Sequence, residues 1–300
     1  MSLQLQVIPD KAIVIRRDRA IVSAVWFGPT VLRPYVFPFV GPGGTELTRI
    51  NHPLDPVSHS HHRSIWVGHR NVNGIDFWGE QKDPGRITCA SISDLKEKGP
   101  QVNATMNLSW NRPDGDELLA ERRKLTFSDL GSQNLALDLE MEFRSTSDQP
   151  VKLDVSNFGL LGVRVARTLR VHEGLGGQIL NSSEAENESG CFGQHAYWID
   201  YSGPVPVAAQ KGAPKPAPGT LPAIVAGVTC YDHPKNPADD TMWHVRDDGW
   251  MGPSLTRTKA ISITRERLVI RYRIETHAGR AWQARVSERY RAWRRSESRG

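Results

Sequence analysis

The segment from Asn51 to Trp78 concentrates side chains that can titrate, form hydrogen bonds or stack. It contains five of the ten histidines, and acidic, basic and indole side chains lie between them. These residues are His52, Asp55, His59, His61, His62, Arg63, Trp66, His69, Arg70, Asp76 and Trp78. Imidazoles exchange protons near neutral pH and also bind transition metals. The segment therefore predicts a functional pocket lined by several of its own residues.

One interpretation of the histidines is a metal site. On an extended backbone His59 and His61 point to one side, and two imidazoles at this spacing can hold a metal ion. His69 could be a third ligand, and Asp76 or Asp200 could complete the shell. A divalent metal is therefore one candidate cofactor. The competing interpretation needs no cofactor and uses the imidazoles as acids and bases.

Two later polar segments could supply the opposite wall of the same pocket. Residues 197–203 (YWIDYSG) place Asp200 between aromatic residues. Residues 231–246 (YDHPKNPADDTMWHVR) carry a further polar cluster that includes His244 and Arg246, and its Asp232-His233-Pro234 joins a carboxylate and an imidazole at a rigid turn. A capped loop explains the second segment equally well. The acid–base hypothesis assigns the catalytic roles to His61, His62, Asp200 and His233.

Arginine and tryptophan side chains are the candidates for holding a substrate. Arg164 interrupts an apolar strand pattern and needs a carboxylate or an anionic ligand if it faces inward. Trp66 and Trp78 offer flat apolar faces that suit the C–H groups of a sugar ring, although core packing explains most tryptophans equally well. The expected substrate-binding residues are Arg63, Trp66, His69, Asn73, Asp76, Trp78, Arg164 and Arg246.

The elements that must position these residues are mainly strands. Residues 134–143 (NLALDLEMEF) alternate apolar and polar side chains, as expected for a strand with one buried face. The same pattern or a short apolar run predicts strands at 3–8, 12–16, 20–27, 35–40, 64–68, 87–93, 104–110, 118–127, 151–157, 160–166, 224–231, 259–264 and 267–275. Such a series predicts a large, all-β antiparallel sandwich.

Only residues 281–295 have a helical period, with Trp282, Val286, Tyr290 and Trp293 at spacings of four, four and three. This C-terminal helix is expected to pack its aromatic stripe on the outside of a sheet. Residues 203–222 contain six prolines and predict a loop. Because strand alternation resumes at Ile224, residues 1–300 are expected to form a single domain.

The composition excludes several classes of protein. No apolar run approaches the roughly 18–20 residues that span a bilayer, and the N-terminal segment lacks the layout of a signal peptide. Three widely separated cysteines favour a reducing, cytoplasmic setting. The net charge is +5, and residues 265–300 alone carry eleven arginines. No nucleic-acid-binding motif accompanies them, so a solvated basic face is expected. Walker, GxGxxG, GxSxG and HExxH motifs are absent.

Several motifs resemble the family that domain collections label "methane oxygenase PmoA". They include RPYVFP at 33–38, HHR at 61–63, WVGH at 66–69, VNGIDFW at 72–78, WIDYSG at 198–203 and DHPKNP at 232–237. The sequence departs from that pattern at Ser58-His59-Ser60, where relatives tend to have Asp-His-Pro. The label would imply a methane monooxygenase subunit, which spans a membrane, and this chain has no such span.

The resemblance implies a bacterial protein associated with sugar catabolism, and the size and strand pattern are similar at fold level to galactose-mutarotase-like β-supersandwiches. The resulting hypothesis is a cytoplasmic enzyme that acts on a sugar or an oxidised sugar as an epimerase, lyase or hydrolase. The alternatives are a metal-dependent enzyme and a non-catalytic sugar-binding module. The expected partner is a small carbohydrate, and the protein could form a homo-oligomer or associate with a sugar oxidoreductase.

Overall fold

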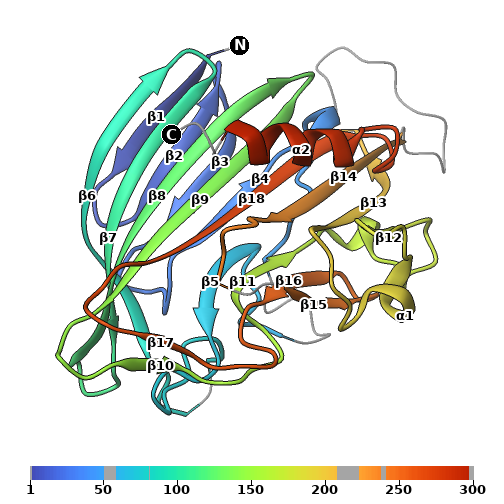
Figure 1. The fold of residues 1–300 in the computed structure, drawn as a ribbon. Coiled ribbons are helices and arrows are strands. Elements are labelled where there is room, and N and C mark those ends of the chain that lie inside the picture. The colour runs from blue at the N-terminus through green and yellow to red at the C-terminus, as the bar shows by residue number, and fades with distance from the viewer. Residues whose placement is uncertain (1, 51–58, 81, 208–222, 238–240, 297–300) are drawn as a thin grey trace.

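The computed structural model describes residues 2–50, 59–80, 82–207, 223–237 and 241–296. The predictions that concern His52 and Asp55 lie outside these residues, as does most of the proline-rich segment, at 208–222. Two large curved sheets make up most of the fold, and a helix lies along one of them (Figure 1).

The first sheet has eight strands in the order β1-β2-β3-β4-β5-β11-β16-β15, and each strand is antiparallel to its neighbours. The strands are β1 (Leu3–Ile8), β2 (Ala12–Arg17), β3 (Ala20–Trp26), β4 (Tyr35–Phe39), β5 (Ile65–His69), β11 (Gly159–Arg164), β16 (Trp250–Ser254) and β15 (Met242–Arg246). The pairing of β11 with both β5 and β16 brings segments together that are far apart in the sequence.

The second sheet also has eight antiparallel strands, in the order β12-β13-β14-β18-β9-β8-β7-β6. They are β12 (Gln178–Asn181), β13 (Trp198–Pro206), β14 (Ala223–Asp232), β18 (Leu268–Ala278), β9 (Asn134–Ser145), β8 (Glu117–Gly131), β7 (Gln101–Asn111) and β6 (Arg86–Lys98). The remaining elements are β10 (Val151–Leu153) paired with β17 (Ile261–Ile263), the 3-10 turns η1 (Pro42–Gly44) and η2 (Arg167–Leu169), and the helices α1 (Asn187–Cys191) and α2 (Val286–Ser296).

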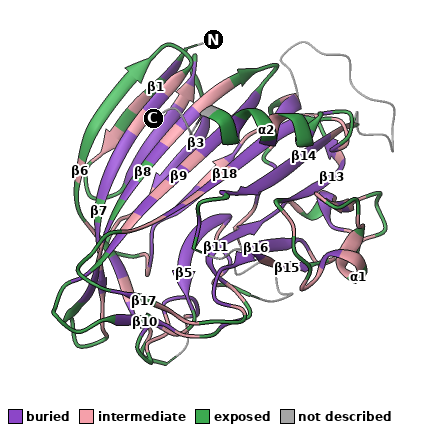
Figure 2. Cartoon of the chain, viewed as in Figure 1, coloured by how far each residue is buried: buried purple, intermediate pink, exposed green. Residues whose placement is uncertain are grey.

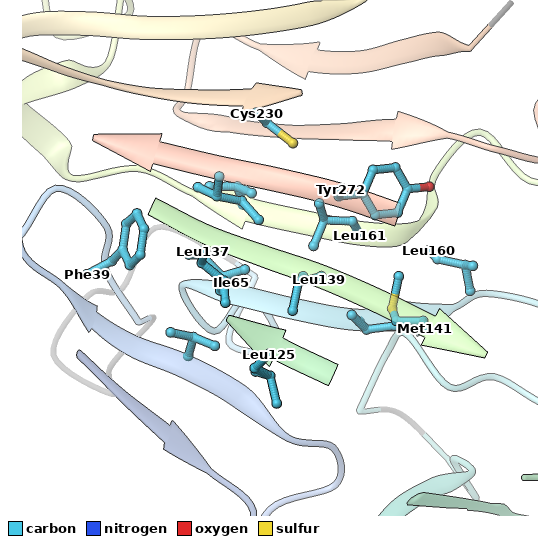
Figure 3. Close-up of a cluster of buried hydrophobic side chains, with 14 of the residues drawn as sticks. Phe39, Ile65, Leu125, Leu137, Leu139, Met141, Leu160, Leu161, Cys230 and Tyr272 are labelled. Atoms are coloured by element: carbon cyan, nitrogen blue, oxygen red, sulfur yellow. The ribbon is translucent and has the colours of Figure 1, made fainter. Parts of the chain in front are cut away.

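The main core lies between the inner faces of the two sheets. In β9 the five alternating apolar residues, from Leu135 to Phe143, are all buried, and the acidic residues between them face outward. Figure 2 shows this alternation as stripes along the long strands. In Figure 3, Leu137 and Leu139 of the second sheet lie with Ile65 and Leu161 of the first. The predicted all-β antiparallel sandwich is confirmed.

Four strands were not predicted, namely β12, β13, β15 and β16. All five residues of β16 and most of β13 are buried, because both faces of these strands are covered. A strand that is buried on both sides has no polar face, so the alternation that identifies a half-buried strand is missing.

The proline-rich segment begins as a strand and not, as predicted, as a loop. Gly203–Pro206 form the end of β13 and pair with Ala223–Ala226 of β14. On its other side β13 pairs with β12 only as far as Ser202, so Pro204 and Pro206 lie where one strand edge is open. Proline is tolerated at such an edge because no neighbour needs its missing N–H.

The C-terminal helix begins later than predicted, at Val286. Val286, Tyr290 and Trp293 form the buried stripe and pack on Trp198 and Tyr231 of the second sheet. Trp282 does not belong to this stripe, because it lies before the helix and its side chain is 72% exposed. The helix does cover the outer face of the sheet, since Ile199 and Cys230, the neighbours of Trp198 and Tyr231, point into the main core.

Cys89, Cys191 and Cys230 are free thiols. Within the described ranges, no helix combines the length and the apolar character that crossing a bilayer requires.

Candidate functional site

A cavity of about 610 Å³ lies on the outer face of the first sheet, over β5, β11, β16 and β15. The face can be assigned because Ile65 and Met251 belong to the main core, whereas their neighbours Trp66 and Trp250 belong to a separate aromatic cluster. The described residues on its wall are His59, His61, His62, Arg70, Trp78, Gly79, Glu80, Phe158, His244, Arg246, Asp248 and Trp250. The size is within the range of small-molecule sites.

Three of the predicted histidines meet in this cavity, although not on an extended strand as expected. The backbone N–H of His62 donates to the carbonyl of His59 over 2.8 Å, which closes a tight turn. All three rings are therefore in contact, with centroid distances of 5.6 Å between His59 and His61, 4.6 Å between His59 and His62, and 4.4 Å between His61 and His62.

The turn formed by His59–His62, called the histidine turn below, rests on Trp66. The ring of His62 is stacked on Trp66, which is buried and is absent from the cavity wall. Trp66 pairs with Gly162 of β11, and a Cβ at position 162 would come within 2.4 Å of the indole. Only a glycine leaves this space, so Trp66 is a supporting residue and not the exposed sugar platform that was expected.

Burial keeps the imidazoles of the cavity neutral at pH 7. Burial lowers the pKa of His244 to about 4, and burial together with the charge of nearby Arg33 lowers that of His61 to about 4. It also lowers the pKa of His59, and it holds that of His62 far below the usual range, with added repulsion from His61 and Arg164. Neutral imidazoles can each accept one proton or hydrogen bond and donate another.

Two buried arginines lie beneath the cavity. Arg164 is only 1% exposed, and its Nη1 lies 2.9 Å from Oδ1 of Asp248, which is on the wall. Arg33 donates to the carbonyl groups of Trp78 and Gly79. The Nε atoms of both arginines are buried and have no hydrogen-bond partner in the described structure. The floor of the cavity therefore has positive charge and unused donor capacity.

The carboxylates of the wall are each paired with an arginine. Besides Asp248, Glu80 accepts from Nε of Arg63 at 3.2 Å. Arg246, a predicted binding residue, lies on the wall and pairs with Glu188 of α1 at 2.9 Å. Arg63 itself is not on the wall and acts through Glu80.

Aromatic side chains form one continuous side of the cavity. Trp78 lies 5.0 Å from Phe158 and 6.0 Å from Trp250, between ring centroids. His244 is stacked on Trp250 at 4.3 Å. Of these four, only Trp78 was predicted. His244 lay in a polar segment noted in the sequence, but nothing local marks Phe158 or the hairpin of β15 and β16 as part of a site.

Two predicted binding residues, Asp76 and Asn73, are not on the cavity wall and instead hold backbone segments near it. Oδ1 of Asp76 accepts from the backbone N–H groups of Trp78 and Gly79 at 2.8 and 2.9 Å, which fixes the turn before the cavity wall. Asn73 is exposed and accepts from the backbone of Lys152.

His69 is fully buried away from the cavity wall. Its Nε2 lies 2.8 Å from Oγ1 of Thr256, and its Nδ1 lies 3.0 Å from the carbonyl oxygen of Asn71. Both ring nitrogens have protein partners, so His59, His61 and His69 do not come together as ligands. Among the residues with assigned positions, no group of three or more His, Cys, Asp or Glu side chains is arranged to hold a metal ion.

Asp200 and His233 are not on the wall of this cavity. Asp200 is buried in the second sheet, where its Oδ2 accepts from Oγ1 of Thr229 at 2.7 Å and lies 2.5 Å from Nε2 of His277. It shares the face of β13 with Trp198, which is the face that α2 covers. His233 lines a different cavity. The expectation that later segments join the histidines holds only for Arg164, Arg246 and His244.

The comparisons with known proteins supply a family but no activity. No curated protein matches the chain. The sequence model of a family of unknown function, DUF6807, matches residues 29–291. This finding overturns the resemblance to the family labelled "methane oxygenase PmoA", and the likeness to galactose-mutarotase-like proteins is not found either. The match covers most of the chain, so the protein belongs to the DUF6807 family.

Proposed function

We propose that the cavity on the first sheet binds a sugar or an oxidised sugar, and that the protein transforms it by acid–base chemistry in which His61 carries the proton. One observation supports the proposal most directly. His61 and His244 are neutral imidazoles on the wall of a cavity whose other side consists of Trp78, Phe158 and Trp250. Aromatic faces suit the apolar C–H face of a sugar ring, and imidazoles suit its hydroxyl groups.

The charges favour an oxidised sugar, which carries a carbonyl or carboxylate group. The ion pairs at the cavity join five arginines with four carboxylates, which leaves an excess of one positive charge. The arginines are Arg33, Arg63, Arg70, Arg164 and Arg246, and the carboxylates are Asp76, Glu80, Glu188 and Asp248. The surplus of cations attracts an anionic or carbonyl oxygen. Glu80 and Asp248 can still accept hydrogen bonds from hydroxyl groups, because each carboxylate oxygen has two lone pairs.

His61 is better placed than its neighbours to transfer a proton. Its ring is partly accessible, whereas His62 is buried and stacked on Trp66. With a pKa of about 4 the free imidazole is a weak base. A bound carboxylate would add negative charge and raise this pKa toward neutral pH, where a general base is most effective. Ligand binding and activation of the base are therefore linked.

The reaction would begin at a carbon next to a carbonyl or carboxylate group. The imidazole of His61 takes the C–H proton, and the electron pair of that bond moves onto the carbonyl oxygen, which the arginines stabilise. Delivery of a proton from solvent to the other face gives an epimer. In an elimination, the electron pair instead forms a C=C bond and expels the oxygen substituent of the next carbon, which takes up the proton from His61, and an unsaturated product results. A hydrolase would instead use the same imidazole to activate water.

The first test is a screen of neutral sugars, aldonates, uronates and ketosugars by calorimetry, followed by proton NMR of each bound compound in D₂O. Proton removal is expected to exchange a ligand C–H for deuterium or to yield a new product. His61→Gln should abolish exchange or turnover while changing affinity less than about tenfold, because the aromatic and arginine contacts remain.

The matched control is His172→Gln, since His172 is exposed and lies outside the cavity. It should behave like the wild type. Binding without any exchange or product, unchanged by His61→Gln, would identify a sugar-binding module and reject catalysis. Failure of every sugar and sugar acid to bind would reject the ligand class.

A further inference from the structure

A second cavity, of about 360 Å³, lies beside the C-terminal part of α2, at the ends of β12 and β14. It shares no lining residue with the histidine cavity. The side chains that matter here are Ser182, Tyr197, Asp232, His233 and Arg294. Side chains from four parts of the chain therefore converge on a space that is large enough for a small molecule.

His233 presents a hydrogen-bond donor that no described residue satisfies. Its side chain is only 3% exposed, and its Nδ1 accepts from the backbone N–H of Lys235 at 3.1 Å. Because Nδ1 is the acceptor, the proton of the neutral ring is on Nε2. Nε2 is buried and has no hydrogen-bond partner in the described structure. An unpaired buried donor costs stability, and a ligand oxygen would remove that cost.

Asp232, the preceding residue, also lines the cavity and offers a hydrogen-bond acceptor. It is almost fully buried, and Nδ2 of Asn236 donates to its Oδ1 at 2.8 Å, which fixes the orientation of the carboxyl group. Burial raises the pKa of Asp232 to about 6. At pH 7 a carboxyl group with such a pKa is mostly ionised, and a carboxylate accepts hydrogen bonds from hydroxyl groups.

Tyr197 provides an aromatic face at the rim. Its side chain is 59% exposed although it lies on the wall, and it is stacked on Tyr290 of α2 with centroids 5.6 Å apart. The backbone N–H of Tyr197 donates to Oγ of Ser182 at 2.8 Å, which ties the rim to the strand end opposite. The ring is thus held in place while one side remains open to solvent.

We propose that this second cavity binds one unit of a neutral sugar, independently of the histidine cavity. Asp232 would accept from one hydroxyl group, Nε2–H of His233 would donate to a neighbouring oxygen, and Tyr197 would pack against the C–H face of the ring. The opposite charges of Asp232 and Arg294 leave no surplus charge that favours an anion or a cation. The proposal does not depend on the chemistry at His61.

The test uses methyl glycosides of common hexoses and pentoses as probes, with binding measured by ligand-observed NMR and by calorimetry. At least one glycoside is expected to bind with a Kd no weaker than about 1 mM, equivalent to about −4 kcal/mol. Tyr197→Ala should weaken that binding by about tenfold or more, which corresponds to about 1.4 kcal/mol. Tyr197→Phe, which keeps the ring, should retain it.

Trp282→Ala removes another exposed aromatic side chain and is the matched control. It should leave glycoside binding unchanged. His233→Ala provides a second test inside the cavity and should also weaken binding. The proposal is overturned if no glycoside binds, or if the glycoside binding that is observed is unaffected by Tyr197→Ala and His233→Ala.

Discussion

The imidazole of His62 is stacked on the indole of Trp66, with ring centroids 4.8 Å apart and ring planes 24° apart. The indole in turn occupies the space over Gly162 on the neighbouring strand. The position of the histidine turn therefore depends on a glycine that has no chemistry of its own.

Gly162→Ala should disturb the site from below. The added methyl group would meet the Trp66 indole at 2.4 Å, so the indole must shift and carry His62 with it. We expect a loss of about 1–3 kcal/mol in the free energy of unfolding, as for other overpacked positions, together with weaker ligand binding. Urea denaturation and calorimetry measure the two effects. Gly190→Ala is the control, because its nearest neighbour is 3.3 Å away and it lies in the short helix α1. Equal stability of the two variants would contradict the supporting role of Trp66.

How far the fold could be predicted depended on which strand faces meet water. The long strands β7, β8 and β9 have one face in the core and one outside, and their alternation identified them correctly. The strands β13 and β16 are covered on both sides, so their sequences carry no period of two.

The site could be predicted only where its residues are neighbours in the sequence. His59, His61, His62 and Trp78 belong to one short run, and their density indicated a pocket. Trp250 reaches them through the pairing of β16 with β11 and of β11 with β5. Local sequence does not specify such long-range pairing, so the hairpin was missed. The prediction also placed Asp200 in the pocket. Its sequence does not show that the carboxylate pairs with His277, which is 77 residues away, beneath a helix.

The pair of Arg164 and Asp248 should contribute more to stability than an exposed pair of the same length. Asp248→Asn would leave the charge of Arg164 buried with no carboxylate, and we expect a loss of about 1–3 kcal/mol, less than for a fully buried pair because Asp248 is 37% exposed. Glu188→Gln breaks the exposed pair with Arg246, also 2.9 Å long, and should cost less than about 1 kcal/mol. Denaturant titration of both variants gives the comparison. Sulfate should stabilise Asp248→Asn more than the wild type, since an anion can replace the missing charge. A smaller loss for Asp248→Asn than for Glu188→Gln would contradict the prediction.

His69 should make the protein less stable in acid. Burial lowers its pKa to about 4, whereas an unfolded histidine titrates near 6.5, so the unfolded chain binds the extra proton first. Its contribution to stability is fully present above about pH 6.5 and is lost as the pH falls toward 4, with a slope of up to about 1.4 kcal/mol per pH unit. His69→Gln should reduce the slope of unfolding free energy against pH by that amount. Thr256→Val, which removes only the partner of Nε2, should lower stability but keep the slope. An unchanged slope in His69→Gln would show that the ring is protonated in the folded protein.

The buried pair of Asp200 and His277 should have the opposite pH dependence. Burial alone would lower the pKa of His277, but the charge of Asp200 and its hydrogen bond outweigh burial and raise it. The stabilisation is therefore fully present below the unfolded pKa of about 6.5 and is lost as the pH rises through the raised pKa of the folded protein. Asp200→Asn removes the partner of a buried charge, and we expect a cost of about 3–5 kcal/mol near pH 6 that shrinks as the pH approaches 9.

The control for this experiment is Asp138→Asn, which breaks the partly exposed pair with Arg273, 2.7 Å long, on the outer face of the same sheet. Arginine stays protonated throughout this range, so the cost of that substitution should not vary with pH. The unfolding free energies of the wild type and both variants, measured at pH 6, 7.5 and 9, show whether the cost of each substitution varies with pH. If the cost of Asp200→Asn were equally large at pH 9, the imidazole of His277 would be neutral in the folded protein, and the pair would be an ordinary buried hydrogen bond.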